Sequence, residues 1–291
     1  GLRGFEILNT PDITAAAGTG GTWLIDPYDL NIGGNTGSIV TNSGTTQAPV
    51  FSPSNSTARI AISTLQNALK NDATVSITTS TQDNGTGGNI SLEEDLAYNN
   101  NSSGQNINNT SKSTLILTAA KDIYIKNNIT RTGGGTGNLS LELLATGNVY
   151  IFDDKRIETQ GGYFKATGVN FDSFSRGSTG IDNVNDDQNF GTINTSGTAG
   201  GGDIDITVSG YADVGSLIFK DSNGNTQTQV ANISIKADGN VSLNKEIDFA
   251  GVGLTASNKA GFKIECNGNI AINQSLLDSV EDELGLKNFT V

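Results

Sequence analysis

The residues best suited to chemistry in this sequence are carboxylates, and one group of them lies in the stretch IDNVNDDQN, residues 181–189. Asp182, Asp186 and Asp187 could offer several oxygen ligands to a calcium ion, which prefers oxygen donors. Their spacing differs from that of an EF-hand loop, and the chain lacks the nonapeptide repeats of calcium-binding β-rolls. We therefore expect these three aspartates to lie in a binding loop, predict no metal site, and keep calcium binding as an open alternative.

A second pair of acids, Asp153 and Asp154, is followed directly by Lys155 and Arg156 in the segment IFDDKRI. Paired carboxylates are the catalytic groups of most glycosidases. Neighbouring side chains on a strand point to opposite faces, so these two acids could act together only in a turn. We expect a solvated corner here, and a polysaccharide-processing enzyme is the alternative.

The chain contains no histidine and a single cysteine, Cys266. The lack of histidine excludes Ser-His-Asp and Cys-His catalysis and most zinc sites. One cysteine cannot form an intramolecular disulfide, and its place in the alternating run FKIEC predicts a small buried side chain. The segments GTGGNI and GGGTGN precede neither a helix nor a Walker lysine, so they do not indicate a phosphate loop. We predict a protein that is not an enzyme and uses no cofactor.

The charge balance excludes several partners. Thirty acidic residues against 17 basic ones give a formal net charge of −13. Phosphate binding needs clustered lysine and arginine, so we expect no nucleic-acid partner, and an anionic membrane surface is disfavoured for the same reason. No stretch approaches the roughly 18 apolar residues of a spanning helix, so we expect no membrane insertion.

A short pattern of alternating hydrophobic residues returns along the chain, as in TLILTAAKDIYIKNNI and NISIKADGNVSLNKEI. Equivalent pairs are separated by 26 residues between positions 123 and 149 and by 29 residues between positions 241 and 270. These pairs are Ile123 and Ile125, Val149 and Ile151, Val241 and Leu243, and Ile270 and Ile272. Such steps are typical of a parallel β-solenoid, in which each coil buries the inward face of its neighbour. The predicted fold is all-β, with residues 1–291 forming one elongated solenoid.

Other segments predict how the coils are joined and covered. Glycine-rich corners should precede strands at four equivalent places, GTGGTWLI, GTGGNISL, GGGTGNLSL and AGGGDIDI. ISTLQNALKN predicts a short helix, capped by Ser63 with Gln66 three residues on, that caps or plugs the stack through Leu65, Ala68 and Leu69. We expect residues 168–191 to form a loop excursion and residues 275–291 to form a terminal helix or cap.

The most distinctive stretch is GTWLIDPYDLNI, from Gly21 to Ile32. With the helix-like STLQNALKN and the strands ATVSITT, NISLEEDLAY and STLILTAAKDIYIKNNI that follow, it resembles filamentous-haemagglutinin-like exoproteins of bacterial two-partner secretion. The resemblance covers residues 19–130 and fits an internal fragment without the amino-terminal secretion domain. It implies a right-handed parallel β-helix, export by an outer-membrane secretion partner to the cell surface or medium, and adhesion. It does not identify a ligand.

Two residues of this stretch have structural roles in the prediction. Pro27 should end a strand, because proline cannot donate to a ladder. Trp23 should lie in the core or at an end of the stack, and a sugar-stacking role is the alternative.

The predicted function is therefore a non-catalytic structural or adhesive stalk that presents loops to a glycan or protein receptor on a host or other cell. Two alternatives remain. One is a polysaccharide-binding or -processing β-helix of the tailspike or glycosidase type. The other is an ice- or carbohydrate-binding solenoid, which would need a flat ladder of outward threonines, and TVSITTSTQ offers these only locally.

Overall fold

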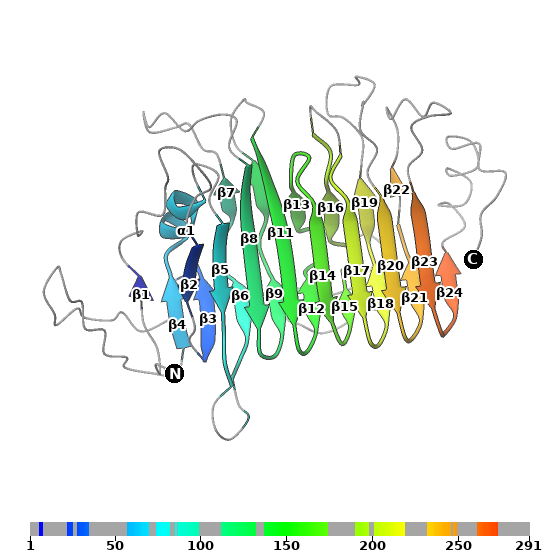
Figure 1. Cartoon of the computed structure of the whole chain (residues 1–291), viewed down its shortest axis with the longest axis horizontal. Helices are drawn as coiled ribbons and strands as arrows, with labels where there is room; N and C mark the ends of the chain where they lie inside the picture. The colour runs from blue at the N-terminus through cyan, green and yellow to red at the C-terminus, as the bar shows by residue number, and fades with distance from the viewer. Residues whose placement is uncertain are drawn as a thin grey trace, which may run out of the picture.

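The computed structural model consists of three parallel β-sheets wound from one repeating coil (Figure 1). It describes residues 6–7, 22–25, 28–34, 57–69, 74–81, 85, 87–98, 112–131, 137–173, 190–197, 201–218, 232–245, 247–248 and 261–272. A full coil contributes one strand to each sheet in turn, and the next coil repeats the order. The result is an elongated stack and confirms the predicted parallel β-helix.

The strands are named by sheet. Sheet 1 contains β2 (Thr22–Ile25), β5 (Thr74–Thr78), β8 (Lys112–Ala119), β11 (Asn138–Ala145), β14 (Phe164–Gly168), β17 (Ile204–Val208), β20 (Ile233–Ala237) and β23 (Phe262–Cys266). Sheet 2 contains β1 (Glu6–Ile7), β4 (Thr57–Ile60), β3 (Asp29–Ile32), β6 (Ile90–Leu92), β9 (Ile123–Ile125), β12 (Val149–Ile151), β15 (Phe171–Asp172), β18 (Ala212–Val214), β21 (Val241–Leu243) and β24 (Ile270–Ile272). Sheet 3 contains β7 (Leu96–Tyr98), β10 (Ile129–Arg131), β13 (Arg156–Glu158), β16 (Thr192–Asn194), β19 (Ser216–Ile218) and β22 (Ile247–Asp248).

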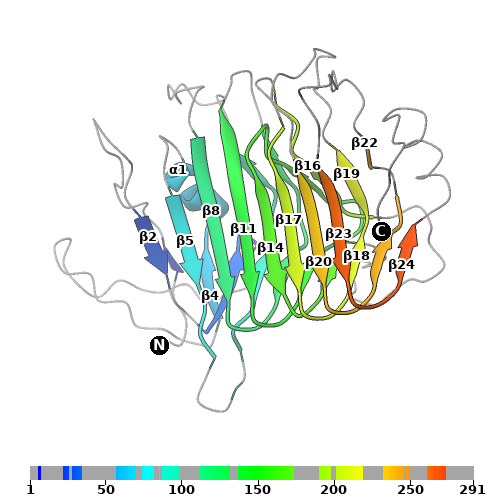
Figure 2. The same cartoon turned by 45° about the vertical axis from the view of Figure 1, so that its right-hand side comes forward.

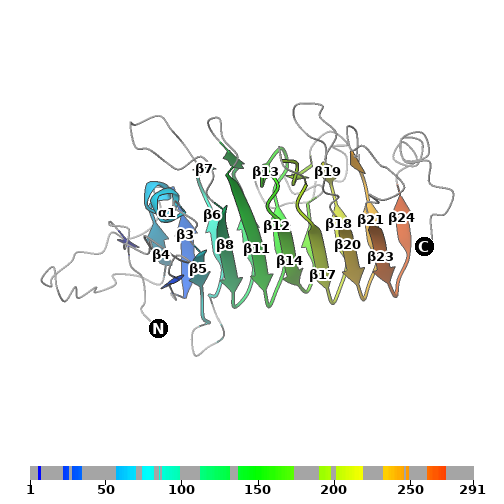
Figure 3. The ribbon, with the colours of Figure 1, turned by 45° about the horizontal axis from the view of Figure 1, so that its top comes forward.

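The hand of the coil follows from the arrangement of sheets 1 and 2. In Figure 1 the strands of sheet 1 face the viewer and run downward, those of sheet 2 run upward behind them, and successive coils advance to the right. Figure 3, in which the top comes forward, separates the two sheets in the same order. This sense of winding is right-handed, as expected for parallel crossovers. Figure 2 shows sheet 1 as one continuous face from β2 to β23.

The hydrophobic pairs that repeat in the sequence lie directly on one another. Ile123 pairs with Val149, and Val241 pairs with Ile270, so both predicted steps are confirmed. The three phrases GTGGTWLI, GGGTGNLSL and AGGGDIDI lead into sheet 1, through β2, β11 and β17. GTGGNISL instead leads into β6 of sheet 2, so the prediction that all four glycine-rich corners are equivalent is wrong. Glycine is needed at more than one corner of the coil.

Aliphatic side chains from successive coils form continuous columns inside the stack. One column of sheet 1 consists of residues that are at most 1 % exposed: Val75, Leu115, Leu141, Phe164, Ile204 and Ile233. Phe164 also packs edge-to-face on Phe171 of sheet 2, with ring centroids 6.3 Å apart. Burial of these columns is the main stabilising term, because each strand exposes its inward side chains until the next coil covers them.

A column of asparagine and aspartate residues stabilises the corner between sheets 1 and 2. Asp29 is the first residue of β3, each of the others directly precedes a strand of sheet 2, and a side-chain oxygen of several of them accepts a hydrogen bond from the next coil. The bonds run from Asn89 N to Asp29 Oδ1 (2.8 Å), Asp122 N to Asn89 Oδ1 (3.3 Å), Asn148 N to Asp122 Oδ1 (2.7 Å), Tyr211 N to Asn170 Oδ1 (2.9 Å) and Asn269 N to Asn240 Oδ1 (2.9 Å). The ladder satisfies corner amides that lie outside the strands.

The predicted helix is α1 (Ile62–Ala68), at the amino-terminal end of the stack (Figure 1). Leu65, Ala68 and Leu69 are buried in the core, as predicted. The Ser113 hydroxyl of β8 donates to the Leu69 carbonyl (2.5 Å), which ties the end of the helix to sheet 1. The predicted cap is wrong: α1 begins at Ile62, so Ser63 lies in its first turn and is exposed.

Several predictions concern residues that are only partly described. Trp23 lies in β2 and pairs with Val75, but its side chain and Pro27 lie outside the described part of the chain. Of the predicted excursion at 168–191, residues 168–173 belong to β14, β15 and their flanks, and residues 190–191 lead into β16. Residues 174–189 and 275–291 lie outside the description. In the described ranges, no helix is long and apolar enough to span a membrane.

Candidate functional site

The acids singled out in the sequence do not form a site in the described structure. Asp182, Asp186 and Asp187 lie outside the described residues. Asp153 and Asp154 occupy the turn between β12 and β13, where Asp154 is exposed and has a positive φ of 58°. Over the described ranges, no group of three or more histidine, cysteine, aspartate or glutamate side chains could hold a metal ion.

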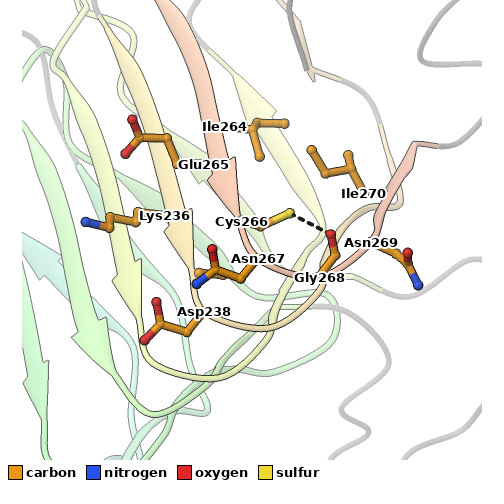
Figure 4. A pocket seen from close by; sticks show the side chains of 10 residues that line it. Lys236, Asp238, Ile264, Glu265, Cys266, Asn267, Gly268, Asn269 and Ile270 are labelled. Carbon is orange, nitrogen blue, oxygen red and sulfur yellow. Dashed lines mark hydrogen bonds between the residues drawn. The ribbon is translucent and has the colours of Figure 1, made fainter.

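Cys266 lies beside a hollow of about 640 Å³ at the carboxyl-terminal end of the described coils (Figure 4). Its side chain is half-buried, and its thiol lies 3.3 Å from the Gly268 carbonyl oxygen. Figure 4 shows Ile264 on the inner side of β23, while Glu265 points to the outer face. A hydrogen bond from Lys263 and its positive charge lower the pKa of the exposed Glu265 carboxyl. The hollow forms because no further described coil stacks on β23 and β24.

A second hollow, on the outer face of sheet 1, has the features of a ligand groove. It has a volume of about 540 Å³ and is lined where five successive strands begin, at β8, β11, β14, β17 and β20. We call it the sheet 1 groove. Its polar side chains include Lys112, Thr114, Ser140, Tyr163, Asp203 and Asn232.

Glycines form the floor of the sheet 1 groove. A Cβ atom on Gly162 would lie 2.2 Å from the Leu139 carbonyl oxygen, and one on Gly202 would lie 1.9 Å from the Gly162 carbonyl oxygen. Only glycine allows the three coils to approach this closely. Gly161 and Gly201 also line the groove, so its floor is bare backbone over two successive coils.

Tyr163 is the aromatic residue of the groove. Its hydroxyl donates a hydrogen bond to Glu142 Oε1 of β11 at 2.5 Å and accepts one from the Thr114 hydroxyl of β8. Burial raises the pKa of Tyr163 to about 12, and the hydrogen bond and negative charge of Glu142 add to this rise. These two partners place the hydroxyl of Tyr163, which directly precedes β14, over β11 and β8. Two partners on different strands therefore fix the ring along the outer face of the sheet.

The far end of the groove is a polar ladder. Asp203 Oδ1 accepts hydrogen bonds from the Asn232 backbone N–H at 2.7 Å and from the Asn232 amide at 3.4 Å. Asn232 Oδ1 in turn accepts from the Gly261 N–H at 3.2 Å. Both side chains are exposed. They present a carboxylate and an amide at fixed positions beside the glycine floor.

The remainder of the outer face of sheet 1 mixes several chemistries. One row contains Thr78, Thr118, Thr167 and Thr207, but Leu144 stands between the second and third threonines. The neighbouring row places Glu142, Lys165 and Asp205 side by side. These rows give no uniform plane of threonines.

Two carboxylates in or beside the sheet 1 groove accept hydrogen bonds. Asp203, which lines the groove, accepts from Asn232, and Glu142, which lies beside it, accepts from the Tyr163 hydroxyl. Neither the models of known protein families nor the curated proteins gave a match to this sequence.

One signal for this groove is present in the sequence. Gly161 and Gly162 precede Tyr163 as Gly201 and Gly202 precede Asp203, so a glycine pair and a polar residue recur just before sheet 1 strands. The repeat alone does not indicate a site, because Lys112, Tyr163 and Asn232 are far apart in sequence and come together only when the coils stack.

Proposed function

We propose that this chain is a non-catalytic segment of a large exported bacterial surface protein, a β-helical stalk with a contact role. The observation that carries the proposal is the unbroken stacking of coils: described strands continue sheet 1 from β2 to β23 through one hydrophobic core. Such a stack is elongated and offers long, continuous outer faces for contact.

The resemblance of residues 19–130 to filamentous-haemagglutinin-like exoproteins supports the same proposal. TWLI of the resembling stretch forms β2 and DLNI forms β3. β2 is the first strand of sheet 1, and β3 lies in sheet 2 between β4 and β6. In the next two coils, β5 and β8 continue sheet 1, and β6 and β9 continue sheet 2. The proposal includes export of the full-length protein by an outer-membrane secretion partner.

Two experiments test the parts of this proposal. Antibodies raised against the folded chain should label intact cells of the source bacterium as strongly as permeabilised cells. Beads coated with the folded chain should adhere saturably to host cells or matrix proteins more than albumin-coated beads do, without release of reducing sugar from polysaccharides. Labelling only after permeabilisation would contradict export. Release of reducing sugar from a polysaccharide would contradict the non-catalytic role and favour a glycosidase.

A further inference from the structure

We propose that the sheet 1 groove binds an uncharged, linear glycan, aligned with the axis of the coil stack, with one sugar ring on the exposed part of Tyr163. This proposal names a ligand class for the contact role proposed above. It rests on that proposed role only for what the binding would accomplish at the cell surface. Four features of the groove carry it: its length, its aromatic ring, its polar rim and its charge.

The length of the groove fits an extended polymer. Its lining comes from five consecutive coils, from Lys112 in the first to Asn232 in the last. Neighbouring coils are about 4.8 Å apart, so four steps give a groove of about 19 Å along the axis. A single sugar would leave most of this length empty, whereas a linear oligosaccharide would occupy it.

Tyr163 provides a prepared surface for a sugar ring. Its hydroxyl is held by Glu142 at 2.5 Å and by Thr114, and the residue is only half-buried. A pyranose ring has an apolar face of C–H groups and a polar edge of hydroxyls, which matches an aromatic ring set among polar side chains. Because the hydrogen bonds already fix the tyrosine, binding would cost little additional side-chain entropy.

The rim of the groove offers both donors and acceptors. Lys112 is an exposed donor, the Asp203 carboxylate is an exposed acceptor, and the Ser140 hydroxyl can serve as either. Sugar hydroxyls also act as both donors and acceptors, so they require a mixed rim of this kind. The bare backbone at Gly162 and Gly202 lets a ligand come close to the sheet between these side chains.

Other ligand classes fit the groove less well. In the lining the charge of Lys112 is offset by Asp203, and Glu142 adds a negative charge beside it. The whole chain carries a net charge of −13, which opposes nucleic acids and sulfated glycans. An extended peptide binds by adding a strand to a free sheet edge. The groove lies instead on the face of β8, β11, β14, β17 and β20, and each of these strands is paired on both sides.

The test is isothermal titration of the folded 291-residue chain with a panel of neutral linear hexasaccharides of glucose, xylose, galactose and N-acetylglucosamine. A heparin oligosaccharide and single-stranded DNA serve as anionic probes. Variants Tyr163→Ala, Tyr163→Phe and Glu142→Ala are compared with the matched control Tyr211→Ala, which removes an exposed tyrosine that does not line the groove. Circular dichroism and the urea midpoint of each variant report its folding.

We expect at least one neutral hexasaccharide to bind with one site per chain. Tyr163→Ala should weaken its affinity about tenfold or more, as loss of an aromatic contact predicts. Tyr163→Phe keeps the ring but loses the hydroxyl that Glu142 holds, so Tyr163→Phe and Glu142→Ala should each weaken the affinity, but less than Tyr163→Ala does. Tyr211→Ala should leave the affinity unchanged. Should Tyr163→Ala unfold the chain, Glu142→Ala and Tyr163→Phe still decide the matter.

Three results would overturn the proposal: no neutral oligosaccharide binds, only the anionic probes bind, or folded Tyr163→Ala binds as tightly as the unchanged chain. The outcome is separable from that of the stalk proposal. Glycan binding that depends on Tyr163 without adhesion of coated beads would refute the contact role alone. Adhesion of coated beads that is unchanged in Tyr163→Ala, with no glycan binding, would refute only the proposal that the sheet 1 groove binds a glycan.

Discussion

Two neighbouring leucines in β11 allow the inward and outward faces of the coil to be compared by the same substitution. Leu143 is completely buried and lies in register between Leu117 of β8 and Ala166 of β14. Leu144 points outward and is half-buried between Thr118 and Thr167. Replacing either residue with alanine removes the same atoms from the same strand, so differences in β-propensity largely cancel.

The expected costs differ because only one of the two substitutions leaves a cavity. Leu143→Ala should lower the free energy of unfolding by about 2–5 kcal/mol, as buried leucine-to-alanine changes do when the surroundings cannot collapse. Leu144→Ala exposes no closed space and removes side-chain area that is already partly in water, so about 1 kcal/mol is expected.

Urea denaturation followed by circular dichroism measures both variants, and the midpoints should be compared only if the slopes agree. Coil arrays can unfold in parts, so amide hydrogen exchange at β8, β11 and β14 should accompany the melts. Exchange in these strands should accelerate in Leu143→Ala and stay near that of the unchanged chain in Leu144→Ala. Equal losses of stability, or a larger loss for Leu144→Ala, would refute the assignment of inward and outward faces.

Three further predictions concern the corners of the coil and the groove. Gly202→Ala should destabilise the chain by several kcal/mol, because the new Cβ would lie 1.9 Å from the Gly162 carbonyl oxygen; a variant with an unchanged melting temperature would contradict the close stacking of these coils. Asp122→Ala should lower the free energy of unfolding by about 1.5–3 kcal/mol, because Asp122 Oδ1 accepts hydrogen bonds from both the backbone and the side-chain N–H groups of Asn148. Asp122→Asn keeps an acceptor oxygen and should lose much less stability in the same urea melts. Because the fold raises the pKa of Tyr163, the protonated hydroxyl contributes its full stabilisation below the ordinary tyrosine pKa of 10.0, and this contribution is lost as the pH rises towards 12. The melting temperature should therefore fall more steeply over this interval in the unchanged chain than in Tyr163→Phe. Parallel curves for the two proteins would show that the Tyr163 proton is not held by the fold.

The parallel coil could be predicted from sequence because hydrophobic alternation reports directly which side chains are buried. The inward pairs such as Ile123 with Ile125 mark strands of sheet 2 without any knowledge of the loops. The spacing between coils is not constant, however: Val149 pairs with Phe171 after 22 residues, and Phe171 pairs with Ala212 after 41. Alternation gives the face of each strand but not which corner holds the additional residues.

That limit explains the predictions that failed or were missed. The glycines of GTGGNISL resemble those of the sheet 1 corners and predict an equivalent position, although the segment leads into β6 of sheet 2. Local spacing predicts Ser63 as a cap, whereas α1 already begins at Ile62. The sheet 1 groove needs Lys112, Tyr163 and Asn232 to line up across five successive coils, and their alignment depends on the lengths of the loops between them.

Backbone contacts of β20 test the parallel stacking of coils most directly. In a uniformly labelled sample, nuclear Overhauser effects between amide and α protons should connect Ile235 with Ile206 of β17 and with Ile264 of β23. If β20 instead formed an antiparallel hairpin with β21, the strand next along the chain, Ile235 would show such backbone contacts to Val241 or Leu243. Cross-peaks of the first kind are the predicted result, and a hairpin pattern would contradict the stacked coil.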